Sequence, residues 1–244
     1  MLTDVQKERY ARQLLELSED QQSLLLSKKV VQVGIGGLGS PLAYYLVSMG
    51  VGNLTIIEYD NISLSNLNRQ IMYSTPEIGS PKAEVAKMKL EALNPDVKIE
   101  VIQKKLTQEN YKELINKPDY LVDASDNAKT KFLVNDIGID LNIPLTIAGV
   151  REMEGQILSV IPHETACYRC VFGKTKPKGI VNNPPKPLGI YGFTAGTLGA
   201  IEAAEVVKGL LDIDGRLLNS LLMVDLHHMQ FMNVKVTRNL DCIC

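Results

Sequence analysis

The 244-residue sequence has no long hydrophobic run. Its longest apolar stretch, Leu188 to Ile201, has 14 residues, which is too short to cross a bilayer as a helix and predicts a buried helix instead. The first residues, MLTDVQKERYARQ, lack the apolar core of a signal peptide. We therefore expect a cytoplasmic protein that has no membrane partner.

The chain also lacks an excess of charge of one sign. Its 26 basic and 28 acidic residues give a formal net charge of −2. Proteins that bind nucleic acid or acidic membranes usually carry a basic surface, so the charge balance argues against both. We find no internal repeat and no low-complexity tract. A chain of this length can bury one substantial core, which predicts a single domain over residues 1–244.

Cysteine is scarce, and all four cysteines fall in two close pairs, Cys167 with Cys170 and Cys242 with Cys244. Paired cysteines in a cytoplasmic protein indicate metal or redox chemistry more often than disulfides. Four thiolates suit tetrahedral Zn²⁺, although the one-residue spacing of the second pair could strain such a site. A redox C-x-x-C motif or plain free thiols are the alternatives. The histidines lack ligand spacing with one another, which favours core or surface positions: His163, His227 and His228.

The most informative stretch is VVQVGIGGLGS, which begins at Val30. Its β-branched start predicts a buried strand, and Gly34, Gly36 and Gly39 form a G-x-G-x-x-G turn into a helix that Pro41 opens. The first glycine allows a tight turn, the second lets the backbone approach a phosphate, and the third lets helix and strand pack closely. This pattern predicts a nucleotide-binding turn.

Further strand and helix patterns follow this turn. The next strand, Leu54 to Glu58, ends in an acid 19 residues after Gly39, where a ribose-binding carboxylate belongs. We expect an α/β fold with a Rossmann-like doubly wound, mostly parallel sheet and a C-terminal antiparallel extension. The expected strands are 30–33, 54–58, 97–102, 119–124, 145–149 and 156–161 with a hairpin of 221–226 and 229–236, and the main helices are 107–115, 128–141 and 191–211.

Several charged residues lie near the expected strand ends. Ser80 and Pro81 resemble a helix cap and first-turn proline, so Lys82 would lie where an anion binds, unless it is simply a solvated lysine. Asp123 or Asp126 could hold Mg²⁺ on a triphosphate, or could cap the following helix. From spacing alone, Arg12 is best interpreted as a solvated helix residue.

Two C-terminal stretches also stand out. A loop rich in proline and lysine follows Cys170, over residues 171–189, and loops of this length are usually functional or disordered. The first half of helix 191–211 is small and apolar, which predicts close packing against another helix or a partner subunit.

Several ordered motifs together resemble the MoeB/ThiF/HesA family of ubiquitin-activating-like adenylyltransferases. The matching segments, which cover nearly the whole chain, are RYARQ at 9–13, GIGGLGS at 34–40, GVGNLTIIEYD at 50–60, SLSNLNRQ at 63–70, GSPKAE at 79–84, DASDN at 123–127, GQI at 155–157, CYRC at 167–170 and RN at 238–239. The resemblance implies transfer of AMP from ATP to the C-terminal Gly-Gly carboxylate of a ubiquitin-like sulfur carrier, with release of pyrophosphate, in a molybdopterin or thiamine type of pathway. It also implies a homodimer.

The resemblance assigns a role to each matching residue. Residues 1–150 would bind the nucleotide, and residues 151–244 would bind the carrier and zinc, with loop 171–189 over the carrier tail. The family more often has Asp where this chain has Glu58. The implied nucleotide contacts are Gly36 and Gly37 at the α-phosphate, Glu58 at the ribose, and Asn66, Arg69 and Lys82 at the phosphates. Asp60 is also expected to bind the nucleotide. Asp126 would hold Mg²⁺ with Asn127 beside it, and Arg12 would be supplied to the neighbouring subunit.

Two other functions are possible for such a sequence. An NAD-dependent Rossmann oxidoreductase would account for Gly34 to Glu58, but it leaves Arg12, Arg69 and Lys82 without a purpose. A binding module without catalytic activity is the second alternative. Between Cys170 and Cys242 there is no cysteine, whereas some relatives use one there, so sulfur chemistry after adenylation would need another protein or a sulfide source.

Overall fold

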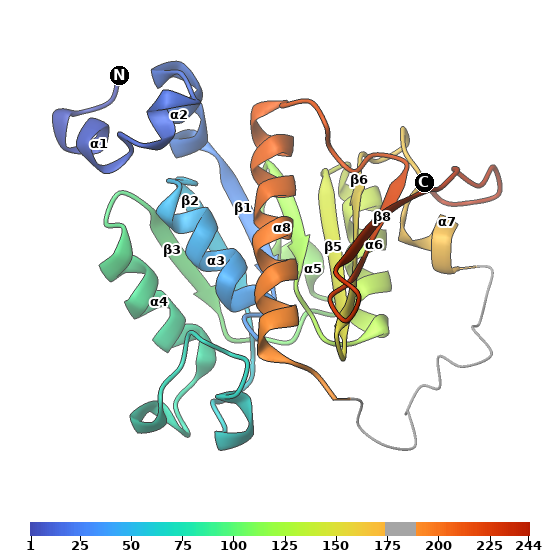
Figure 1. The fold of residues 1–244 in the computed structure, drawn as a ribbon, viewed down its shortest axis with the longest axis horizontal. Coiled ribbons are helices and arrows are strands. Elements are labelled where there is room, and N and C mark those ends of the chain that lie inside the picture. The colour runs from blue at the N-terminus through green and yellow to red at the C-terminus, as the bar shows by residue number, and fades with distance from the viewer. Residues whose placement is uncertain (174–188) are drawn as a thin grey trace.

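The computed structural model describes residues 1–173 and 189–244. The strands of this part form one eight-stranded sheet with the order β3-β2-β1-β4-β5-β6-β7-β8 (Figure 1). Strands β1 to β5 pair in parallel, and β6 to β8 add an antiparallel extension, so the expected fold class is confirmed. The strands are β1 Lys29–Val33, β2 Asn53–Ile57, β3 Lys98–Ile102, β4 Tyr120–Asp123, β5 Leu145–Arg151, β6 Glu154–Val160, β7 Ser220–Asp225 and β8 Gln230–Lys235.

Helices cover both faces of the sheet. The face seen in front in Figure 1 packs against α2 Glu19–Ser27, α3 Gly39–Ser48, α4 Lys82–Leu93 and α8 Gly192–Leu211. The opposite face packs against α5 Tyr111–Leu114, α6 Ala128–Leu141 and α7 Tyr168–Phe172. The other helical segments are α1 Asp4–Arg9, η1 Gln13–Leu15, η2 Leu64–Asn66 and η3 Thr75–Glu77.

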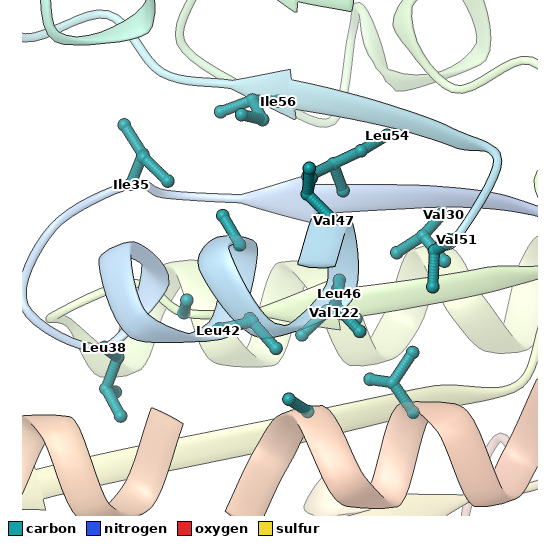
Figure 2. Packing of buried hydrophobic residues seen from close by; sticks show 14 of the residues in the cluster. Val30, Ile35, Leu38, Leu42, Leu46, Val47, Val51, Leu54, Ile56 and Val122 are labelled. Atoms are coloured by element: carbon teal, nitrogen blue, oxygen red, sulfur yellow. The ribbon is translucent and has the colours of Figure 1, made fainter. Parts of the chain in front are cut away.

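The strands alternate between two hydrophobic cores, as a period of two requires. In β1, Val30 belongs to the core under α3 and α8, whereas Val31 and Val33 belong to the core under α6. Figure 2 shows Leu42 of α3 and Leu54 of β2 in the same cluster as Val30. Because both faces are buried, β1 reads as a nearly continuous apolar run in the sequence.

Small residues allow α8 to lie close to its neighbours. A Cβ atom on Gly199 would lie 2.5 Å from the carbonyl oxygen of Leu38, at the start of α3. A Cβ atom on Gly155 of β6 would lie 2.5 Å from Leu198 of α8. The small-residue half of the helix therefore packs against another helix, one of the two predicted arrangements. Within the described residues, no helix is both long and apolar enough to cross a membrane.

Two expected helix starts are wrong in detail. The predicted helix 107–115 is only Tyr111–Leu114 in α5, because the side chain of Asn110 accepts a hydrogen bond from the backbone N–H of Thr107 (2.8 Å) and holds a turn there. At α4 the capping residue is Pro81 and not Ser80, and Lys82 is the first helical residue.

The sheet has a topological switch point beside β1, which pairs with β2 on one side and with β4 on the other. Val33, the last residue of β1, lies in register with Ile57 and Asp123, the last residues of those two neighbours. The connections after these strands leave in opposite directions and open a crevice beyond the carboxyl ends, where open α/β sheets bind ligands.

Candidate functional site

A cavity of about 640 Å³ lies beyond the carboxyl ends of the parallel strands. This volume is in the usual range for small-molecule and cofactor sites. Its lining includes residues that follow the first four of these strands, among them Gly34, Glu58, Lys104 and Ala124, and Gly149 within β5. Segments far apart in the sequence therefore meet at one site.

The glycine turn forms one wall of the cavity. Gly34 has a φ of +93°, and a Cβ atom there would lie 3.0 Å from the carbonyl oxygen of Ala124. A Cβ atom on Gly39 would lie 2.3 Å from the carbonyl oxygen of Gly34, so this position must be glycine for α3 to pack on β1. Gly36 and Gly37 line the cavity, as expected for residues that bring the backbone close to a phosphate.

The carboxylate of Glu58 is fixed by three backbone N–H groups. One oxygen accepts from Ile35 in the glycine turn (3.1 Å), and the other accepts from Tyr59 (2.8 Å) and Asp60 (2.9 Å). The residue is 8% exposed and lines the cavity. A carboxylate held in this way joins β1 to β2 and presents a rigid acceptor, which suits a ribose hydroxyl.

Lys82 and Asp60 form an ion pair at the start of α4. The Lys82 Nζ lies 3.1 Å from the Asp60 carboxylate, and the Lys82 side chain is 6% exposed whereas that of Asp60 is 51% exposed. The Tyr73 hydroxyl donates to the carbonyl oxygen of Ile35 in the glycine turn (3.0 Å) and lies 3.4 Å from the carbonyl oxygen of Lys82 in α4. Tyr73 therefore holds the start of α4 beside the glycine turn. The ammonium group of Lys82 thus lies at a cavity wall beside the helix N-terminus.

Arg69 and Asn66 lie in the segment between β2 and α4, but only Arg69 lines the cavity in the described structure. The Arg69 guanidinium donates to the Ser65 carbonyl oxygen and to the Asn68 side chain, both at 2.9 Å. The Asn66 side chain instead accepts from the backbone N–H of Ser63 (3.0 Å) and shapes the turn that carries Arg69. Direct phosphate binding by Asn66 stays a prediction.

The loop after β4 carries the expected metal ligand. Asp126 is exposed and lines the cavity. Asn127 is the cap of α6, since its side-chain oxygen accepts from the Thr130 backbone N–H (2.9 Å), and its amide nitrogen lies 3.3 Å from Asp126 Oδ1. Asp123 is wrong as a metal candidate, because it is 0% exposed and its carboxylate is 2.7 Å from the Lys131 ammonium. An aspartate cap for α6 is wrong too.

Arg12 lies apart from the cavity of its own chain. It is exposed just before η1 and forms no ion pair with the described residues. Its neighbours are anchored: Tyr10 is 1% exposed and its hydroxyl accepts from Asn94 (2.9 Å), and Gln13 donates to the Met49 carbonyl oxygen (2.9 Å). The body of the protein therefore holds this segment while leaving the guanidinium free to meet another molecule.

A group of buried polar residues at and beside the cavity was not predicted from the sequence. Gln70 lines the cavity, is 5% exposed, and its side-chain oxygen has no hydrogen-bond partner among residues 1–173 and 189–244. Lys131 is 6% exposed, and Glu202 of α8 is 0% exposed. No local pattern marks these positions, because what surrounds each of them depends on how α6 and α8 pack on the sheet.

Glu202 is a fully buried acid whose pKa is raised by its surroundings. Burial and the nearby Asp123 carboxylate raise the pKa of Glu202 well above 4.5, and the Lys131 ammonium only partly opposes them. Neither carboxyl oxygen has a hydrogen-bond partner in the described residues. Ionisation here would leave a second buried negative charge beside a single ammonium.

Glu202→Gln is therefore expected to flatten the pH dependence of stability. The folded state keeps the Glu202 proton at pH values at which the unfolded chain has already lost it. The free energy of unfolding therefore falls as the pH rises from about 4.5 toward the raised pKa. For one proton the slope is at most about 1.4 kcal/mol per pH unit. Denaturant unfolding from pH 5 to 9 measures this slope. The exposed Glu91→Gln is the control, and an equal slope in Glu202→Gln and the starting protein would contradict a raised pKa at Glu202.

The four cysteines converge beside α7, on the face of the sheet opposite to α3 and α8. Their Sγ atoms all lie within 4.8 Å of one another, with separations of 3.9 Å for Cys167 to Cys170, 3.5 Å for Cys167 to Cys242 and 3.3 Å for Cys170 to Cys244. Four sulfurs around one Zn²⁺ lie about 3.8 Å apart. The short spacing of the second pair does not keep either sulfur out of the cluster, so the donor set fits zinc.

Backbone groups around this cluster favour a thiolate at Cys170. Burial opposes ionisation, but hydrogen bonds from the backbone of Asn239 and Cys167 and from the thiols of Cys244 and Cys242 together lower the pKa of Cys170 to about 7. The Asn239 nitrogen lies 3.3 Å from the Cys170 sulfur. Burial raises the pKa of Cys167, which is the effect that a bound cation would reverse.

Comparisons with known proteins agree with these features. The ThiF family matches residues 10–244. A sulfur carrier protein adenylyltransferase of Thermus thermophilus is 39% identical over 248 residues, which cover 98% of this chain and 91% of that protein. The SAMP-activating enzyme E1 of Haloferax volcanii is 38% identical over 243 residues, which cover 99% of this chain and 89% of that protein.

A solved structure supports the fold. Escherichia coli MccB superposes with a TM-score of 0.88 over 100% of this chain and 74% of that chain, at 22% identity. The family match spans the glycine turn, the cavity and the cysteine cluster, and the resemblance seen in the motifs is confirmed. The chain belongs to the ThiF family.

Proposed function

We propose that this chain is an adenylyltransferase that transfers AMP from ATP to the C-terminal Gly-Gly carboxylate of a ubiquitin-like sulfur carrier and releases pyrophosphate. The names of its relatives support this activity. The observation that carries the proposal is the convergence on one cavity of the glycine turn, Glu58, Arg69, Lys82 and Asp126.

The reaction needs alignment and charge neutralisation more than proton transfer. The carrier carboxylate is ionised at neutral pH, so its oxygen attacks the α-phosphorus without a general base, and the bond from this phosphorus to the bridging oxygen breaks as pyrophosphate leaves. Gly36 and Gly37 leave room for the phosphates, Glu58 accepts from the ribose, and Arg69 and Lys82 hold the negative charge. Asp126, with Asn127 beside it, would hold Mg²⁺, which supplies further positive charge at the phosphates.

The carrier tail would approach over the antiparallel extension. The cavity continues from Gly149 past Gln156 to Met223 and Met232 on β7 and β8. This path favours residues 151–244 as the carrier-binding half and residues 1–150 as the nucleotide-binding half. Most of the loop expected to cover the tail, residues 174–188, lies outside the described residues.

The cysteine cluster would bind Zn²⁺ through Cys167, Cys170, Cys242 and Cys244 and tie the C-terminal segment to α7. None of the four would then serve as a nucleophile, so sulfur transfer to the adenylated carrier would need another reactant. We place the protein in the cytoplasm, whose reducing conditions keep such thiols available for metal.

We further propose a homodimer in which Arg12 of one subunit completes the site of the other. Co-expressing an Arg12→Ala chain with a Lys82→Ala chain is expected to restore about one quarter of the starting activity, because half of the dimers are mixed and each mixed dimer has one intact site. Pyrophosphate exchange by the mixed population, against each variant alone, measures this effect. No restoration in verified mixed dimers would contradict an arginine supplied by the partner.

The direct test is exchange of labelled pyrophosphate into ATP in the presence of a carrier ending in Gly-Gly. Exchange is expected to require Mg²⁺ and the complete C-terminus, and to be absent with a carrier that lacks its last glycine. Oxidation of NADH without exchange would favour the oxidoreductase alternative, which the relatives do not support. Carrier binding without exchange would favour the binding module that lacks activity.

A further inference from the structure

The buried lysine of α6, Lys131, binds three different segments at once. Its ammonium donates to the Asp123 carboxylate at the end of β4 (2.7 Å), to the Ser125 carbonyl oxygen in the following loop (2.7 Å), and to the Ala148 carbonyl oxygen in β5 (2.5 Å). A lysine ammonium has three N–H groups, so these acceptors satisfy it completely. Although Lys131 lines the cavity, it has no donor left for a ligand.

The three acceptors surround the loop that carries Asp126. Ser125, immediately before Asp126, is held twice, since its carbonyl oxygen accepts from Lys131 and its hydroxyl donates to Asp123 (2.7 Å). On the other side of Asp126, Asn127 is fixed as the cap of α6. Asp126 is therefore an exposed carboxylate between two immobilised residues.

Lys131 and Asp123 form a buried ion pair. Burial raises the pKa of Asp123, and Lys131 opposes that rise. A buried ion pair of this kind is often no more stabilising than apolar side chains of similar volume, so its presence calls for a geometric reason. The geometric reason here is the exact placing of a loop at the carboxyl ends of β4 and β5, next to the cavity.

We propose that Lys131 is a positioning residue for Asp126, and that it sets the loop geometry in which the site takes up Mg²⁺ together with the ATP phosphates. This inference rests on the proposed function only in assigning Mg²⁺ and ATP to the cavity. Lys131 acts through Ser125 and Asp123, and itself touches neither ligand.

The test is the gain in affinity for a non-hydrolysable ATP analogue on adding Mg²⁺, measured by calorimetry. Removing a residue that orients a metal ligand typically weakens metal binding by about 10- to 100-fold, so Lys131→Met is expected to lower this gain by about tenfold. Affinity without Mg²⁺ should change little. General damage to the site would instead weaken binding in both conditions. Lys131→Arg should keep most of the gain.

A second variant guards against misfolding. Lys131→Met leaves Asp123 buried without its partner, whereas Lys131→Met with Asp123→Asn removes both charges and should fold and still lose the Mg²⁺ gain. Lys129→Met, at an exposed position of the same helix, is the matched control and should behave as the starting protein. If the folded double variant keeps the full gain in affinity on adding Mg²⁺, the inference is overturned. It is also overturned if Mg²⁺ does not change the affinity of the starting protein for the analogue.

This outcome is separate from that of the adenylation proposal. A starting protein that binds the analogue with the Mg²⁺ gain, loses it in the variants, and exchanges no pyrophosphate with any Gly-Gly carrier would support the role of Lys131 and contradict the proposed activity. Carrier-dependent exchange by the starting protein, together with an unchanged Mg²⁺ gain in the double variant, would support the proposed activity and contradict the role of Lys131.

Discussion

Lys82→Ala is expected to slow carrier-dependent exchange of pyrophosphate into ATP by about 10²- to 10³-fold, the usual cost of losing one charge-stabilising group from an enclosed site. Lys82 is the first residue of α4 and pairs with Asp60, so it places a cation at the cavity wall beside helix N–H groups. Alanine removes that charge where negative charge develops on the departing pyrophosphate.

The control for this variant lies on the same helix. The Lys87 side chain is 38% exposed and pairs with Glu91, one turn away, so Lys87→Ala should exchange as the starting protein does. Exchange rates at saturating ATP and carrier separate a slower reaction from weaker binding. Equal rates for Lys82→Ala and Lys87→Ala would contradict a phosphate-binding role for Lys82.

If the four cysteines bind zinc as proposed, Cys244→Ser is expected to abolish that binding and to lower the free energy of unfolding by roughly several kcal/mol, since metal binding to a folded site adds directly to stability. The Cys244 sulfur lies 3.3 Å from that of Cys170, and the residue is 2% exposed although it ends the sequence. Losing one of four ligands should free the C-terminal segment from α7.

Metal content by mass spectrometry, together with denaturant unfolding before and after chelation, measures this effect. Asp241→Asn, an exposed neighbour in the same segment, is the matched control and should keep one zinc per chain. Full zinc content in Cys244→Ser, or none in the starting protein, would contradict the four-cysteine site.

The parts predicted well from the sequence are those with local causes. The β-branched residues of β1 and the glycines after them define a strand and a turn within one short stretch, and the structure gives Gly34 the positive φ that this turn needs. Lys82 at a helix start follows from Ser80 and Pro81 in the same way, although the cap itself is one residue later than expected.

The parts that could not be predicted depend on contacts between distant segments. Asp123 and Asp126 are both aspartates after a strand, and only the packing of α6 shows that Lys131 occupies the first and leaves the second exposed to the cavity. The spacing of Cys242 and Cys244 raised doubt about a metal site, because spacing alone does not show that the C-terminal segment folds back beside α7.

The most direct test of the account is a crystal structure with Mg²⁺ and a non-hydrolysable ATP analogue. We expect the ribose at Glu58, the phosphates between the glycine turn and the side chains of Arg69 and Lys82, and the metal at Asp126, with Arg12 of a second subunit reaching the phosphates. A nucleotide bound elsewhere, with Arg69 and Lys82 facing only solvent, would contradict it.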